Sequence, residues 1–241
     1  MPNWCRTSYT FYTDTEKGRE QLADFYNKLT ASISGKHLCI TKSDFGNKWL
    51  GNVIHAFTPQ FLKLMPDNAI CTYEGYDVRF RGSVIDIMTH GDNEVLVITE
   101  TAWGPMTEMW DMILKSCGYD NISYVYQAEE SNNGLFVTND KTGRFYNDKY
   151  YVDLHIADDF HEYETDYISS DEDLLNYLNA VIDDMRNEYN SHPKLYNLPD
   201  EYSADNLKHC DAIDEAIAVI EANLPDNDEA YIIVNKFEIV D

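Results

Sequence analysis

The chain has 241 residues, of which 44% are hydrophobic and 13% aromatic, and it carries a formal charge of −25. The apolar content excludes an acidic disordered tail, because such tails lack the apolar area that offsets the entropy of ordering. The charge disfavours direct binding to nucleic acid or to an anionic membrane, and it favours cations or proteins with a basic surface. The length allows one large domain or two modest ones.

Neither a membrane span nor a signal peptide is evident. No run approaches the ~18 apolar residues of a membrane span, and the opening MPNWCRTSYTF lacks a basic start and an apolar core. The cysteines are widely spaced without a CxxC pair, at Cys5, Cys39, Cys71, Cys117 and Cys210. We therefore expect a cytoplasmic protein with reduced, buried thiols.

The first elements alternate between strand and helix. Residues 4–13 are rich in aromatic and β-branched side chains, which is typical of a strand. Asp14 and Thr15 offer capping oxygens, and apolar residues then recur at helical spacing, so a helix is expected over 15–32. Residues 35–81 indicate loops and short helical pieces, and we interpret them as an insertion.

Regular elements continue after the insertion. Residues 83–89 and 94–101 are typical of two strands joined by a hairpin loop. A helix over 104–118, with proline near its start and glycine at its end, and a strand over 122–129 follow. This order predicts a ferredoxin-like βαββαβ domain over residues 1–130.

The remaining residues, 131–241, predict an acidic α+β region, either a second domain or one packed on the first as a single globule. Residues 134–140 and 144–157 suggest a hairpin around Lys141 to Gly143. Ser169 and Ser170 provide a capping signal for a helix over 171–190. The apolar stripe of that helix is Leu174, Leu178, Val181, Met185 and Tyr189. A second helix is expected from the spacing of Leu207, Cys210, Ile213, Ile217 and Ile220. A final strand is expected over 229–240. The expected fold class is α+β.

The opening Met1-Pro2-Asn3-Trp4-Cys5 and the later step Trp103-Gly104-Pro105 resemble a known family. It comprises phage- and plasmid-borne proteins with a YubB-like ferredoxin-like domain, and the resemblance covers about residues 1–130. Met106 stands where that family usually has a second proline. The resemblance implies a mobile-element origin and a ferredoxin-like N-terminal domain, and it implies no reaction.

Two interpretations are open for the residues of these motifs. Trp4, Cys5 and Trp103 could form a ligand pocket with a reactive thiol, or they could pack in the core where the first strand meets the second helix. Large rings and free thiols are commonly buried for packing alone. We favour core packing.

A metal-binding interpretation applies to the segment VDLHIADDFHE, residues 152–162. Asp153, His155, Asp159 and His161 are ligands of suitable type. On a strand, Asp153 and His155 would share one face, and Val152, Leu154 and Ile156 the other. This spacing matches none of the usual zinc or calcium signatures, so we favour a half-exposed strand that runs into a solvated loop.

No catalytic template is present: the chain lacks GxxxxGK[ST], HExxH, GxSxG and GxGxxG. A Cys–His pair distant in sequence stays open, although nothing selects one pair. We expect a non-enzyme without a cofactor and without a metal.

The acidic residues are concentrated in the second half of the chain. Residues 121–241 carry 28 Asp and Glu against seven Lys and Arg, a net −21, whereas residues 1–120 carry a net −4. Such a surface can serve solubility alone, or its carboxylates can imitate a polyanion such as DNA, which has one charge per ~1.7 Å of axis. The candidate partner-binding residues are Asp153, Asp158, Asp159, Glu162, Glu164, Asp166, Asp171, Glu172, Asp173, Asp183, Asp184, Tyr163 and Tyr167.

The function we expect is that of an acidic binding protein of a mobile element. It would block a basic, nucleic-acid-handling protein, such as a host defence nuclease, by polyanion mimicry. The alternatives are a small-ligand or metal-binding protein that uses the region of His155 and His161, and a structural subunit.

Overall fold

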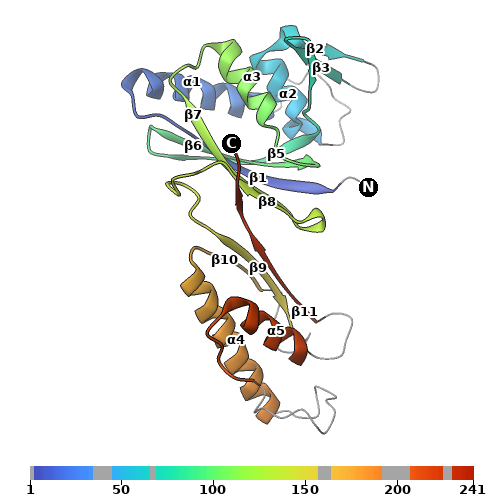
Figure 1. Ribbon diagram of the computed structural model, residues 1–241. Helices are drawn as coiled ribbons and strands as arrows, with labels where there is room; N and C mark the ends of the chain where they lie inside the picture. The colour runs from blue at the N-terminus through green and yellow to red at the C-terminus, as the bar shows by residue number, and fades with distance from the viewer. Residues whose placement is uncertain (1–2, 35–44, 66–68, 157–163, 192–206, 225–229) are drawn as a thin grey trace. The chain divides into compact units, whose positions relative to one another are not determined.

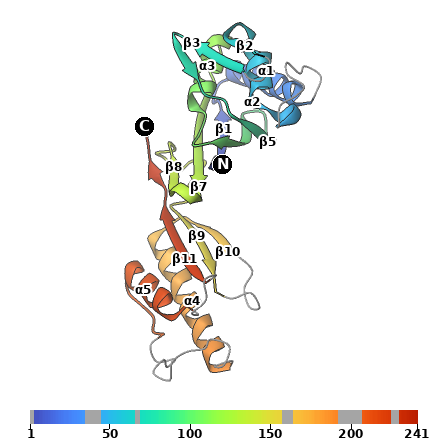
Figure 2. The same ribbon diagram turned by 90° about the vertical axis from the view of Figure 1, so that its right-hand side faces the viewer.

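The computed structural model describes residues 3–34, 45–65, 69–156, 164–191, 207–224 and 230–241. They form two compact units (Figures 1 and 2). Unit 1 contains residues 1–146 and 238–241, and unit 2 contains residues 147–237. Both combine helices with strands, which confirms the α+β class. The chain divides later than the expected residue 130, because residues 131–146 and the last four residues belong to unit 1.

Unit 1 is built on one six-stranded sheet. Its strands, in spatial order, are β12 (Glu238–Ile239), β8 (Leu135–Thr138), β7 (Ser123–Glu130), β1 (Trp4–Tyr12), β6 (Glu94–Ala102) and β5 (Gly82–His90). Neighbouring strands are antiparallel except β12 and β8, which are parallel, so the sheet is mixed. The central strand β1 alternates strictly over much of its length, so that Cys5, Tyr9 and Phe11 are buried.

Three helices cover one face of this sheet, as Figure 1 shows: α1 (Glu16–Ile33), α2 (Leu50–Phe57) and α3 (Thr107–Cys117). Thr15 caps α1 by accepting a hydrogen bond from the N–H of Gly18 at 3.0 Å. Helix α3 ends where Gly118 takes a left-handed conformation, with a φ of 68°. The expected helix over 15–32 is therefore confirmed, and the one expected over 104–118 is present but begins only at Thr107.

An aromatic core lies between the sheet and the helices. Trp110 of α3 is fully buried, with its ring centroid 5.1 Å from that of Phe11 and 6.1 Å from that of Phe25. Tyr9 also packs on Trp110, and its hydroxyl oxygen accepts a hydrogen bond from the N–H of Met106 at 2.7 Å. These contacts fix the start of α3 against the central strand.

The expected insertion over 35–81 contains more regular structure than its sequence suggests. Besides α2 and the short 3-10 helices Gly46–Lys48 and Pro59–Phe61, it contains a small antiparallel sheet, and residues 35–44 and 66–68 lie outside the described residues. The sheet comprises β2 (Leu62–Leu64), β3 (Ala69–Tyr73) and β4 (Tyr76–Val78). Its buried side chains, including Cys71 and Val78, join the core of unit 1.

Unit 2 is a three-stranded antiparallel sheet with helices on one face (Figure 2). The strands, in spatial order, are β10 (Glu164–Ile168), β9 (Tyr150–His155) and β11 (Tyr231–Lys236), and the helices are α4 (Asp171–Ser191) and α5 (Ile213–Asn223). The expected hairpin of 134–140 with 144–157 is wrong. β8 pairs with β7 and β12, whereas β9 pairs with β10 and β11, so the two segments belong to different sheets.

The core of unit 2 lies between its sheet and its helices. All five residues of the expected α4 stripe are buried, from Leu174 to Tyr189, and they pack on Val152 and Leu154 of β9. The second helix begins later than expected, at Ile213, because Leu207 and Cys210 are buried in the segment that precedes it. Among the described residues, no helix is both long and apolar enough to cross a membrane.

The expected final strand over 229–240 is two strands. β11 ends at Lys236 in the sheet of unit 2, and β12 begins at Glu238 in the sheet of unit 1. Phe237 lies between them with 4% of its surface exposed, and its N–H donates to the carbonyl oxygen of Lys149. Unit 2 is therefore inserted between residues 146 and 238 of unit 1.

Candidate functional site

The candidate acidic residues lie on several parts of unit 2. Asp158, Asp159, Glu162 and Tyr163 are outside the described residues, and of Glu164 the structure describes the backbone alone, in β10. The others are Asp153 on β9, Asp166 and Tyr167 on β10, Asp171, Glu172 and Asp173 in the first turn of α4, and Asp183 and Asp184 further along α4. They do not form one continuous row.

The three acids that begin α4 are partly explained by helix formation. Ser170 caps the helix by accepting from the N–H of Asp173 at 3.0 Å, and its hydroxyl group donates to the carboxylate of Asp173 at 2.5 Å. The carboxylate of Asp171 accepts from Lys149 and from the hydroxyl group of Tyr150, both at 2.5 Å. The hydrogen bond from Lys149 lowers the pKa of Asp171. Negative charge at this end also complements the helix dipole.

Asp183 is engaged within unit 2 rather than available to a partner. Its two carboxylate oxygens lie 2.7 Å from Arg186 Nη1 and 2.8 Å from His209 Nε2. The hydrogen bond with His209 lowers the pKa of Asp183. Arg186 also donates through Nε to the carbonyl oxygen of Leu207 at 2.7 Å. These contacts connect α4 to the segment before α5.

Both helices carry exposed acids, and we call five of them the acidic helix layer. It consists of Glu172, Asp173 and Asp184 on α4 and Asp214 and Glu215 at the start of α5, all of them exposed. Glu172 and Asp184 are twelve positions apart, which corresponds to about 18 Å of helix. Over that length duplex DNA presents about ten charges, so the layer is anionic but much less densely charged than a duplex.

The opposite face of the sheet has a different character. Strand register places eight residues on it, which we call the open face: Tyr151, Asp153, His155, Thr165, Tyr167, Tyr231, Ile233 and Asn235. The alternate residues of β9, including Val152 and Leu154, point into the core beneath the helices. Asp153 is the only carboxylate among these eight residues of the described sheet, and none of the eight is Lys or Arg.

Asp153 is at the centre of the open face, on the middle strand. It is half-buried, and both its carboxylate oxygens face the hydroxyl group of Tyr231, which donates to them over 3.4 and 3.5 Å. Burial raises its pKa, although Tyr231 and His155 act in the opposite direction. Asp153 and His155 share a face, as the alternation of the strand predicts, whereas the tyrosines that β10 and β11 bring beside them were not predicted from the sequence.

The metal-binding interpretation gains no support from these positions. His155 is buried, with 2% of its surface exposed, and its ring packs 6.0 Å from that of Tyr231. The expectation of a half-exposed strand therefore fails at His155. Asp159 and His161 are outside the described residues, and in the part that is described no three His, Cys, Asp or Glu side chains are grouped to hold a metal ion.

The expected core packing of Trp4, Cys5 and Trp103 holds for the thiol alone. Cys5 is fully buried, and burial raises its pKa to about 11, which argues against a reactive thiol. Trp103 is 58% exposed and Trp4 38% exposed. Trp103 has a φ of 75° and its N–H donates to the carbonyl oxygen of Asn3, so the backbone holds the ring outward. Trp110 occupies the core position instead.

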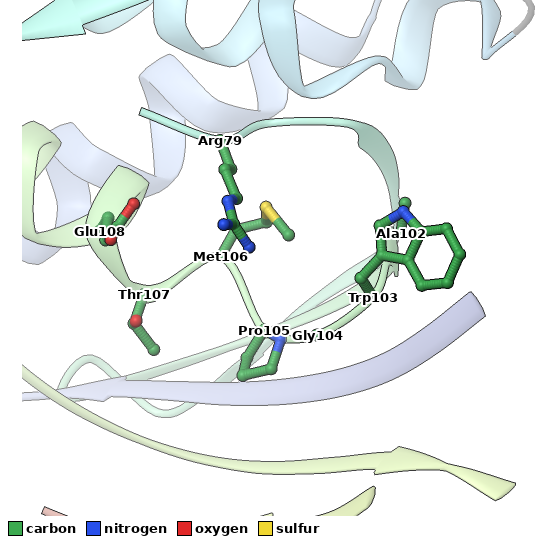
Figure 3. A pocket seen from close by; sticks show the side chains of 8 residues that line it. All are labelled: Arg79, Ala102, Trp103, Gly104, Pro105, Met106, Thr107 and Glu108. Atoms are coloured by element: carbon green, nitrogen blue, oxygen red, sulfur yellow. The ribbon is translucent and has the colours of Figure 1, made fainter. Parts of the chain in front are cut away.

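A small pocket lies beside Trp103, with a volume of about 210 Å³. Figure 3 shows the Arg79 side chain reaching toward Met106, with Trp103 and Glu108 on opposite sides of it. The volume is below the ~300 Å³ at which ligand pockets usually begin, and the Glu108 carboxylate opposes an anion there. The pocket therefore carries no functional argument.

Comparison with protein-family models, with curated proteins and with solved structures finds no match to this chain.

Proposed function

We propose that this protein acts by binding another protein, without catalysis, and that unit 2 contacts a partner with a basic surface. The observation that carries this proposal is the distribution of charge between the units. Unit 2 has 23 Asp and Glu against five Lys and Arg in 91 residues, a net −18. Unit 1 has 20 against 13 in 150 residues, a net −7.

Ordered helices present part of this charge. The buried stripe of α4, with Leu178 and Met185 in the core, fixes which side of the helix faces outward. The side-chain amide of Asn179 makes two hydrogen bonds to the backbone of Cys210, which holds α4 and the approach to α5 together. Carboxylates on such a scaffold lose little entropy when a partner binds, which favours affinity.

The partner class that we propose is a basic protein that handles nucleic acid, such as a host defence nuclease, and the effect is occlusion of its basic groove. A groove that attracts phosphates also attracts the carboxylates of unit 2 and speeds their encounter. Because the acidic helix layer is sparser than a duplex, the mimicry we propose is of overall charge and not of each phosphate.

We also propose that unit 1 is a ferredoxin-like domain from a phage or plasmid protein that works in the cytoplasm. The spatial strand order β7-β1-β6-β5, with α1 and α3 on one face, supports the proposal of a ferredoxin-like domain. The sequence from Met1 to Cys5 and that from Trp103 to Pro105 support the proposed phage or plasmid origin. The small sheet and α2 then constitute the insertion.

The proposal is tested by capture from a lysate of the bacterial host at ~50 and ~300 mM salt, with excess duplex DNA added to half of the samples. We expect a basic nucleic-acid-binding protein to be retained at low salt and released both by salt and by the duplex. Retention that neither salt nor duplex alters would contradict a mechanism based on charge.

A further inference from the structure

We propose that the open face of unit 2 binds one arginine side chain, with Asp153 as the counter-ion and the neighbouring tyrosines as the contact surface. This inference rests on the proposed function, because a basic partner would supply the arginine. It adds a defined recognition point on the face opposite to the acidic helix layer.

The arrangement of the strands supports this site. β9 is the middle strand, and Asp153 has Thr165 of β10 and Ile233 of β11 directly opposite it on either side. Tyr167 and Tyr231 are its diagonal neighbours on those strands. Such neighbours are about 5 Å away when directly opposite and about 7 Å away along the diagonal. One cationic group on Asp153 can therefore touch several rings.

The rings differ in their exposure. Tyr167 and Ile233 are about half exposed, at 45% and 44%, and they form the outer part of the face. Tyr151 is buried, and its ring packs edge-on against that of Tyr167 with centroids 5.6 Å apart. Asp153 is half-buried on the middle strand of the same face. A planar group can therefore reach the carboxylate while it contacts ring surface.

Charge makes a cation the expected occupant. Asp153 is the only carboxylate of the open face in the described residues, and Tyr231 and His155 offset only part of the cost of removing its charge from water. Among the described side chains, its hydrogen-bond partner is the hydroxyl group of Tyr231, at distances longer than usual. A carboxylate has about four acceptor positions, so capacity for a fork of two N–H donors remains.

Arginine fits this face better than lysine does. Its planar guanidinium group pairs with a carboxylate through two parallel hydrogen bonds and also stacks on aromatic rings. A cation within ~6 Å of a tyrosine ring gains further attraction, more so where water is excluded. A lysine ammonium group would be attracted by the charge of Asp153, but it could form neither the two parallel hydrogen bonds nor the stacking on a ring.

The test is a titration of the full chain, observed by NMR through the backbone amides, with N-acetyl-arginine amide as the probe. We expect saturable shifts at Asp153, Thr165 and Ile233. The uncharged citrulline analogue should cause none, and the lysine analogue should bind more weakly. Asp153→Asn, which keeps an acceptor for Tyr231, should weaken arginine binding about tenfold, and Tyr167→Leu should weaken it with the carboxylate intact.

Asp120→Asn in unit 1 is the matched control, because it removes the same charge from an exposed position outside unit 2, and it should leave the titration unchanged. Equal binding of the citrulline or lysine analogue, shifts confined to α4 and α5, or wild-type affinity in a folded Asp153→Asn variant would each overturn the inference. Since the probe is added directly, a failure here is distinguishable from the failure to capture a partner protein.

Discussion

The hydroxyl group of Tyr231 on β11 donates to both carboxylate oxygens of Asp153 on the neighbouring strand β9, over 3.4 and 3.5 Å. The two residues are 78 positions apart in the chain, and they meet because β11 returns to pair with β9. This contact partly compensates a carboxylate that burial has removed from water. Unit 2 therefore carries a charge that its own fold destabilises.

The first prediction concerns this carboxylate. Because burial raises the pKa of Asp153 above the usual 3.8, the folded state binds its proton more tightly than the unfolded state does. The stability of unit 2 should therefore fall as pH rises through the interval between the two values. Asp153→Asn should raise the urea midpoint at pH 7, and this gain should shrink as the pH approaches 3.8.

Asp184→Asn serves as the control for stability, because Asp184 is exposed. Its urea midpoint should follow that of the wild-type protein across the same pH range. A lower midpoint for Asp153→Asn at pH 7 would show that the charge of Asp153 is stabilised in the folded state, against this account.

The second prediction concerns Asn179 on α4. Its amide nitrogen donates to the carbonyl oxygen of Cys210 at 3.0 Å, and its amide oxygen accepts from the N–H of Cys210 at 2.9 Å. Asn179→Ala leaves two polar groups of the buried Cys210 without these partners, which should cost about 2 kcal/mol. Asn176→Ala, an exposed position on the same helix, should change stability by less than about 0.5 kcal/mol.

Denaturant unfolding followed by circular dichroism measures both variants. Equal stability of the two variants would mean that the segment from Leu207 to Cys210 is not held by α4. Because that segment leads into α5, such a result would contradict the proposal that α4 and α5 hold their acidic residues in an ordered arrangement.

Elements with one buried face and a clear period were predictable from the sequence. The stripe from Leu174 to Tyr189 predicts the buried face of α4, and the aromatic and β-branched residues of 4–13 predict β1; the structure confirms both. β10 was missed because Glu164 to Ile168 is short and acidic, and Ile168 is its one residue that the structure shows in the core. An edge strand with so few buried side chains carries little apolar signal.

Pairing was less predictable than the elements themselves. Residues 134–140 and 144–157 have turn-forming residues between them, which favour a hairpin, yet the strands join different sheets. Local signals do not encode which distant strand offers a better partner, such as β12 for β8. For the same reason, the sequence did not predict that Tyr231 and Ile233, near the C-terminal end of the chain, lie on the open face beside Asp153.

The third prediction concerns Asp140, which is 4% exposed in unit 1. Burial opposes its ionisation, but the N–H groups of Phe145 and Tyr146, together with Thr142, more than compensate and lower its pKa. The stability that it contributes should be present above the usual pKa of 3.8 and should be lost as pH falls through the lower, folded value.

Asp140→Asn replaces one acceptor oxygen with a donor that faces N–H groups, so it should destabilise unit 1 by about 2 kcal/mol at pH 7. Asp120→Asn removes an exposed charge in the same unit and should have almost no effect. Thermal unfolding of the two variants at pH 7 measures the difference, and similar losses for both would contradict the role given to Asp140.

The fourth prediction concerns the thiols. Cys5 and Cys71 are fully buried, and burial raises the pKa of each to about 11. Because the thiolate is the reactive form, iodoacetamide at pH 7.5 should leave both unmodified in the native protein and alkylate them after denaturation. Peptide mass spectrometry identifies the modified residues. Rapid alkylation of native Cys5 would revive the reactive-thiol interpretation.

The central claim is that the acidic residues of unit 2 bind the partner. The most direct test removes the same number of negative charges from unit 2 in one variant and from unit 1 in another. Two variants each remove four exposed carboxylates without removing a hydrogen bond described above. One is Glu172→Gln, Asp184→Asn, Asp214→Asn and Glu215→Gln in unit 2; the other is Glu20→Gln, Glu100→Gln, Glu108→Gln and Asp120→Asn in unit 1.

Capture of the partner at ~50 mM salt is then measured for both variants and the wild-type protein, since weak screening at this salt makes surface charges most effective. The account predicts that the unit 2 variant loses most of the captured partner and the unit 1 variant retains it. Equal capture by the two variants, or greater loss from unit 1, would contradict the assignment of binding to unit 2.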